Sequence, residues 1–129
     1  PGSHDFSFSG LKTAVLRMAE ALDSQPPTPE QAAQIAAGFQ EAVVEVLVGK
    51  TVAAARETHV QAILLAGGVA ANAVLRAEMV RRSPVPVYCP RPVLCTDNGA
   101  MIASCGYFRA RAGARSGLDL DVRPNLPLA

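Results

Sequence analysis

The chain has 129 residues, a formal net charge of +1 and a hydrophobic fraction of 50%. This hydrophobic fraction, with only 18% charged residues, excludes an intrinsically disordered chain, and the small net charge excludes the strongly basic surface of a dedicated nucleic-acid module. No apolar run approaches the roughly 18 residues of a membrane span, and no basic segment precedes an apolar stretch. We therefore expect neither a membrane partner nor a signal peptide.

The three cysteines, Cys89, Cys95 and Cys105, are an odd number and form no Cys-x-x-Cys pair. This pattern argues against a disulfide scaffold and against a cysteine-rich zinc site. Thiols in apolar surroundings are typical of a reducing compartment, so we expect a cytoplasmic location. Residues 1–4 could be native sequence or a vector-derived remnant, and no prediction rests on them.

Two helices are predicted in the first half of the chain. Residues 5–10 alternate aromatic and small polar side chains, which predicts an extended segment leading into a helix with Ser9 as its N-cap. A second, long helix begins where Thr28 and Gln31 form a capping box, and runs to about Thr58. The apolar side of the first helix is Leu11, Val15, Met18 and Leu22. One side of the second is Ile35, Phe39, Val43, Val46 and Lys50.

The next part of the chain predicts two short strands on either side of a helix. The apolar run over 60–66 predicts a strand buried on both faces, as in a parallel sheet. Residues 85–90 predict a second strand, with prolines near its ends. The segment 72–82 between them has the pattern of a helix.

The last predicted element is a helix from Thr96 to about Ala112. It is apolar nearly all round, so we expect it to be deeply packed and to be ended by Gly113. The order α-α-β-α-β-α predicts an α/β fold. We expect residues 1–129 to form a single partial domain.

The strongest local pattern is the pair Gly67 and Gly68 after the first predicted strand. Glycines without a Cβ let a ligand lie against the backbone, and N–H groups at the start of the next helix attract polar or anionic groups. The same residues also fit a tight strand-to-helix turn with Asn72 as N-cap, and both interpretations stay open. The run matches neither the P-loop pattern nor the dinucleotide-binding fingerprint.

Two further segments have a structural interpretation beside a functional one. Asp97 could ligate a metal, but no cluster of other ligands accompanies it, so we favour an aspartate that caps a helix. Residues 6–13 could place hydroxyls and a lysine near a phosphate, and here we favour a capped helix with two core phenylalanines. Cys95 is expected to be a packed thiol. No pattern of a nucleophilic triad is present, so no catalytic residue is assigned.

Taken together, three separated segments resemble one family in order and spacing. They are Asp-Phe-Ser-Phe-Ser-Gly-Leu-Lys-Thr at 5–13, Leu-Ala-Gly-Gly-Val-Ala-Ala-Asn at 65–72 and Cys-Thr-Asp-Asn-Gly-Ala-Met-Ile-Ala at 95–103. Nearly the whole chain resembles the C-terminal part of the TsaD family of tRNA N6-adenosine threonylcarbamoyltransferases, formerly described as glycoproteases or O-sialoglycoprotein endopeptidases. The resemblance implies part of the C-terminal lobe of an actin/Hsp70/sugar-kinase-like (ribonuclease H-like) fold.

The resemblance also implies an activity and roles for four residues. The family transfers threonylcarbamoyl from threonylcarbamoyl-adenylate to the adenosine next to the anticodon of tRNA. Asn72 matches the asparagine that binds the adenylate, and Gly67 and Gly68 would let the nucleoside approach the backbone. Asp97 matches the aspartate that ligates Fe2+ or a similar divalent metal. The implied protein partners are TsaB and TsaE.

The chain also departs from the family's pattern. The histidines four apart that supply the other metal ligands are absent, and so is the Ser-Gly-Gly-His-Thr loop. A cation held by Asp97 alone would bind weakly, so we expect no transferase activity from this chain by itself. Uncovered apolar faces would favour self-association. Two alternatives stay open: part of an ATP-dependent kinase of the same superfamily, and a non-catalytic interaction module.

Overall fold

The structure is a computed structural model that describes residues 3–22, 26–96 and 98–121. The chain divides into two compact units, Pro1–Thr96 and Asp97–Ala129. Helices and a small parallel sheet are both present, so the prediction of an α/β chain is confirmed. That residues 1–129 form a single partial domain stays a prediction.

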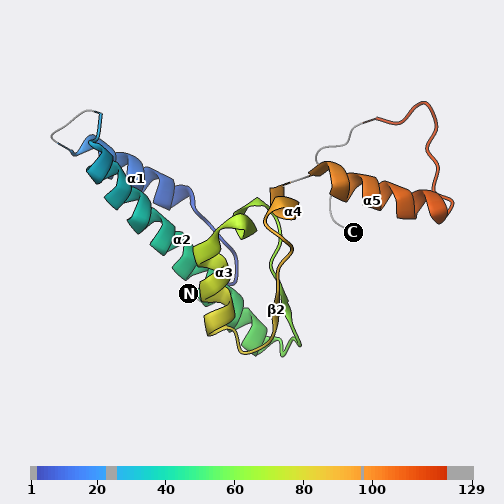
Figure 1. The fold of residues 1–129 in the computed structure, drawn as a ribbon, viewed down its shortest axis with the longest axis horizontal. Coiled ribbons are helices and arrows are strands. Elements are labelled where there is room, and N and C mark those ends of the chain that lie inside the picture. Colours follow the sequence, from blue (N-terminus) through green and yellow to red (C-terminus); the bar gives the residue numbers. More distant parts are fainter. Residues whose placement is uncertain (1–2, 23–25, 97, 122–129) are drawn as a thin grey trace. The chain divides into compact units, whose positions relative to one another are not determined.

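Helices α1 (Ser9–Glu20) and α2 (Pro29–Glu57) lie side by side in the first unit (Figure 1). The capping box at the start of α2 is confirmed, because the Thr28 hydroxyl accepts from the Gln31 N–H at 3.3 Å and the Gln31 side chain accepts from the Thr28 N–H at 2.9 Å. The predicted cap of α1 is wrong. Its N-cap residue is Phe8, without a side-chain cap, and Ser9 is the first helical residue.

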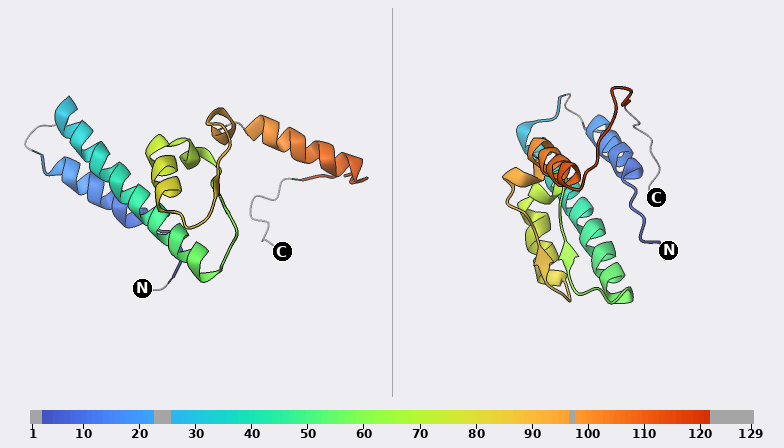
Figure 2. Two further views of the ribbon diagram at one scale, coloured as in Figure 1. Left: turned by 60° about the horizontal axis from the view of Figure 1, so that its bottom comes forward. Right: turned by 90° about the vertical axis from the view of Figure 1, so that its right-hand side faces the viewer.

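The hydrophobic core of the first unit lies between α2, α3 (Ala73–Arg82) and the sheet, and α3 packs across α2 (Figure 2). Its buried members are Val44, Val48, Val52, Ala55, Ile63, Leu75 and Met79. The side predicted for α2 is therefore not the one that enters this core: Phe39 is 39% and Val46 38% exposed. Two apolar rows run along α2, and which of them is covered depends on where α3 and the sheet pack.

The sheet consists of β1 (Ile63–Leu64) and β2 (Val87–Tyr88), which are parallel with Ile63 opposite Val87 and Leu64 opposite Tyr88. The chain crosses between them through α3. The prediction that the first strand is buried on both faces is wrong, since Ile63 is 7% exposed but its neighbour Leu64 is 79% exposed. Among residues 3–22 and 26–96, the helices cover the face of the sheet from which Ile63 projects and leave Leu64 exposed.

Two short elements were not predicted: a 3₁₀ turn, η1 (Gly68–Ala71), after β1, and a helical turn, α4 (Val93–Thr96), after β2. Both follow the carboxyl ends of the parallel strands, and they pack against each other. The simple order α-α-β-α-β-α is therefore incomplete. These two turns bring the segments after β1 and β2 together.

The second unit contains α5 (Asn98–Arg111). Gly113 has a φ of 85°, and the N–H groups of Gly113 and Ala114 donate to Ala110 and Arg109, so the predicted glycine stop is confirmed as a Schellman motif. The predicted deep packing of this helix is wrong: residues 99–111 are all exposed, with Phe108 at 64%. A helix that is apolar nearly all round presents no single face for burial, and α5 is the one helix or strand among residues 98–121.

Among the described residues, α2 is the one helix whose length and apolar composition would allow it to cross a membrane. Core helices of globular domains meet the same criterion. Here α2 begins at a solvent-exposed capping box and contributes four residues to the core.

Candidate functional site

The Gly67-Gly68 pair forms a sharp turn at the carboxyl end of β1. Gly67 has φ 86° and ψ 174°, a backbone conformation that is essentially restricted to glycine. The carbonyl of Gly67 accepts from the Ala70 N–H at 3.0 Å, which closes the first turn of η1. A Cβ placed on Gly67 or Gly68 would meet no atom of the described residues within 4 Å. The space beside this turn is open.

Asn72 joins η1 to α3, and its carboxamide is held at both ends. The Oδ1 atom accepts from the Leu75 N–H at 3.0 Å, so the predicted N-cap is confirmed. The Nδ2 atom donates to Oε1 of Gln40, on α2, at 3.0 Å. A carboxamide has two N–H hydrogens and two acceptor lone pairs, so one of each remains for a ligand.

A cavity of about 510 Å³ lies beside Asn72. It is lined by Phe8, Ala36, Phe39, Gln40, Val43, Leu47, Val69 and Asn72. The lining is apolar except for the two carboxamides. Two of the three segments that define the resemblance, the one containing Phe8 and the glycine turn, therefore meet at one cavity although they are far apart in the sequence. Ligand sites commonly have this composition, an apolar wall with a few polar groups at one place.

The segment before α1 runs along α2. The Lys50 ammonium donates to the carbonyl of Asp5 at 2.5 Å and lies 6.0 Å from the centre of the Phe6 ring. At the end of α2, the His4 ring and the Glu57 carboxylate are 2.7 Å apart. Residues 3 to 8 are thus attached to α2, which places the Phe8 ring at the cavity.

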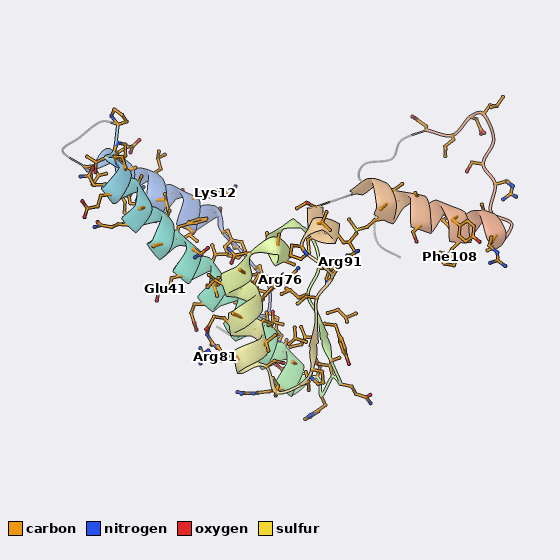
Figure 3. The ribbon with its side chains drawn as sticks, in the orientation of Figure 1. Lys12, Glu41, Arg76, Arg81, Arg91 and Phe108 are labelled. Atoms are coloured by element: carbon orange, nitrogen blue, oxygen red, sulfur yellow. The ribbon has the colours of Figure 1, made fainter. Side chains whose placement is uncertain are left out.

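The expectation of two core phenylalanines is wrong. Phe6 is 48% exposed and Phe8 is half-buried, because one side of each ring faces the surface of α2 and not a closed core. The phosphate interpretation of this segment gains no support, since the Thr13 hydroxyl donates to the carbonyl of Ser9 at 3.2 Å and Lys12 is exposed on α1 (Figure 3).

Arg76 connects the segments that follow the two strands (Figure 3). Its Nε donates to the carbonyl of Ala70. Its Nη2 donates to the carbonyl of Pro90 at 2.7 Å and to Sγ of Cys95 at 3.0 Å. Cys95 is 3% exposed, which confirms the prediction of a packed thiol. Arg76 thus fixes η1 against α4.

The fourth predicted site residue, Asp97, lies outside the described residues. Among the residues that the structure describes, no three His, Cys, Asp or Glu side chains come together as metal ligands. These donors therefore do not form a metal site by themselves. The metal assigned to Asp97 stays a prediction.

Gln40 is the residue at this site that the sequence analysis did not identify. It precedes Asn72 by 32 residues, and no local rule connects the two. The one signal in the sequence for a role of Gln40 is its position: it is a polar residue between Phe39 and Val43 in an apolar helix. That pattern alone does not distinguish a solvated glutamine from one that binds a specific partner.

A family model described as "TsaD: tRNA N6-adenosine threonylcarbamoyltransferase" matches residues 1–104. A Dehalococcoides mccartyi protein named tRNA N6-adenosine threonylcarbamoyltransferase is 56% identical over 126 residues, which are 98% of this chain and 37% of that protein. Proteins of the same name from Thermomicrobium roseum and Symbiobacterium thermophilum are 52% and 51% identical, again over 98% of the chain and over 40% and 38% of their own lengths. The chain thus spans about two fifths of these relatives.

Proposed function

Because the chain belongs to the TsaD family of tRNA N6-adenosine threonylcarbamoyltransferases, we propose that it forms part of an enzyme that transfers threonylcarbamoyl from threonylcarbamoyl-adenylate to the adenosine next to the anticodon of tRNA. The complete relatives are more than twice as long. The proposed contribution of this chain is one wall of the adenylate site. The proposed architecture is part of the C-terminal lobe of an actin/Hsp70-like fold, which the parallel β1–α3–β2 crossover supports.

The proposal rests on the position of Asn72 in the wall of the apolar cavity. The carboxamide is fixed at one end of the cavity and keeps one N–H and one lone pair. A nucleoside offers a flat apolar surface with donors and acceptors at its edges, which fits a wall of this composition. The open space at Gly67 and Gly68 would let the ribose or phosphate approach the backbone N–H groups.

The remaining parts of the proposal concern the complete protein. Asp97 would supply one ligand to Fe2+ or a similar divalent cation, whose chemistry when bound is to polarise an oxygen of the substrate. The described residues do not supply the other ligands, so no step is assigned to the metal. We also propose TsaB and TsaE as protein partners and the cytoplasm as location. The three free thiols are consistent with a reducing compartment.

The adenylate site can be tested by titrating the 129-residue chain with AMP in a calorimeter and comparing an Asn72→Asp variant. Aspartate keeps the oxygen that caps α3, so helix α3 should stay folded. It replaces the free N–H with a negative charge, so AMP should bind at least about tenfold more weakly. Gln34→Glu is the matched control, because it adds the same charge on exposed α2 surface outside this cavity. Equal affinity of Asn72→Asp and the unchanged chain would contradict the site.

The inactivity of the isolated chain has a separate test. Incubation of the 129 residues with Fe2+, threonylcarbamoyl-adenylate and tRNA should give no modified adenosine by mass spectrometry, since one aspartate cannot fix a coordination sphere. Appearance of the modification would show that the chain is sufficient. The family comparison gives no support to the kinase or to the non-catalytic module.

A further inference from the structure

We infer that Gln40 is a positioning residue that holds the Asn72 carboxamide in the orientation in which it meets the ligand. This inference rests on the proposed function, because it concerns the same adenylate site. It adds a residue on α2 that lies outside the three segments by which the family was identified.

Two contacts of different origin determine the orientation of the Asn72 carboxamide. The Leu75 N–H is a backbone donor, so it requires the oxygen of Asn72 on its side. This leaves Nδ2 facing Gln40, whose Oε1 accepts at 3.0 Å. The cap alone fixes where Oδ1 lies. The contact with Gln40 fixes the direction of the two Nδ2 hydrogens.

The carboxamides of Gln40 and Asn72 line the same cavity. Asn72 and Gln40 are both half-buried, and the other lining side chains are apolar. Within this wall, Gln40 is the side chain with a polar acceptor for Asn72. When one Nδ2 hydrogen is directed to Gln40, the second has a defined direction and needs no reorganisation on binding.

Gln40 belongs to a helix that is anchored in the core of the unit. Helix α2 begins at its capping box, and its core row starts four residues later at Val44. A glutamine on this helix therefore holds the η1–α3 junction at a fixed distance from α2. The orientation of Asn72 thus depends on the packing of α3 across α2 and not on the glycine turn alone.

The test compares Gln40→Met with the matched control Gln34→Met, both in the 129-residue chain. Methionine keeps the length and removes the acceptor. The side-chain NH₂ resonances of Asn72, assigned by their loss in Asn72→Asp, should move in Gln40→Met and stay in Gln34→Met. The Leu75 N–H should keep its protection from exchange in both, which a general loss of structure would not allow. AMP affinity should fall about three- to tenfold in Gln40→Met alone, as expected for loss of one hydrogen bond.

A second variant covers the case in which Gln40→Met does not fold. Gln40→Glu retains an acceptor at the same reach, so adenosine, which has no phosphate, should still bind with nearly the affinity of the unchanged chain. Loss of adenosine binding in folded Gln40→Glu would overturn the inference. So would unchanged Asn72 resonances or unchanged AMP affinity in folded Gln40→Met. If the unchanged chain binds no AMP, the proposed adenylate site is not formed by this chain alone, and the resonances still decide the role of Gln40.

Discussion

At the scale of single residues, the adjacent glycines Gly67 and Gly68 differ in backbone conformation. Gly67 has a φ of 86°, whereas Gly68 is not among the residues with positive φ, and the space beside both is open. Gly67→Ala should therefore lower the free energy of unfolding by roughly 1–3 kcal/mol through backbone strain alone. Gly68→Ala should change it by less than about 0.5 kcal/mol. Urea denaturation of the two variants measures the difference, and equal losses would show that the turn does not have this conformation.

The polar side chains of the site differ in how far the sequence could predict them. The cap at Asn72 was predictable because the hydrogen bond to Leu75 spans three residues and follows a local rule. The positive φ of Gly67 agrees with the ordinary interpretation of a glycine pair after a strand. The contact between Gln40 and Asn72 was not predictable, since it depends on the packing of two helices. The same holds for the bonds from Arg76 to the carbonyls of Ala70 and Pro90.

At the scale of elements, an ion pair joins α2 to α3. Arg82 on α3 donates to both carboxylate oxygens of Glu45 on α2, one of them at 3.1 Å. These hydrogen bonds hold the pKa of the Glu45 carboxyl below its ordinary value of 4.5, against the opposite effect of burial. A neighbouring pair within α3 has the same form, because Arg81 lowers the pKa of Glu78.

The Glu45 pair predicts a pH-dependent contribution to stability. A carboxyl group with a lowered pKa in the folded state stabilises the protein fully above its ordinary value of 4.5 and loses this effect as the pH falls through the lowered pKa. Glu45→Gln should therefore be less stable than the unchanged chain at pH 6–7, and the difference should shrink as the pH falls below about 4.5 and vanish below the lowered pKa. It should also shrink in about 1 M salt. Glu41→Gln, an exposed position of the same helix, is the control. A difference that persists at pH 3 would exclude the ion pair as its cause.

Whole helices were predicted more reliably than their buried faces. The start of α2 follows from Thr28, Pro29 and Gln31, which act over one turn. Which of its two apolar rows is buried depends on where α3 and the sheet pack. The periodicity of α2 carries no information about that position. The exposed side of β1 has the same explanation, because an apolar run does not state how many of its faces are covered within the chain.

At the scale of the whole molecule, the two units both expose large apolar side chains. On the sheet these are Leu64 and Tyr88, and on α5 they include Ile102, Tyr107 and Phe108. Exposed apolar side chains of this size favour association, since their removal from water is stabilising. The weight-average mass in sedimentation velocity should therefore rise with concentration. Phe108→Glu should reduce this rise and Arg109→Glu, next to it on the same helix, should not. A constant monomeric mass at high concentration would contradict the prediction.

The bonds made by Arg76 have a consequence for how this part of the chain can diverge among species. Two of its three partners are main-chain carbonyls, at Ala70 and Pro90, which every amino acid supplies. A replacement at position 90 therefore keeps the acceptor in place, whereas a replacement at position 76 removes all three hydrogen bonds. The hydrogen bonds of this junction thus depend on the side chain of Arg76, and Ala70 is limited separately because it is 1% exposed.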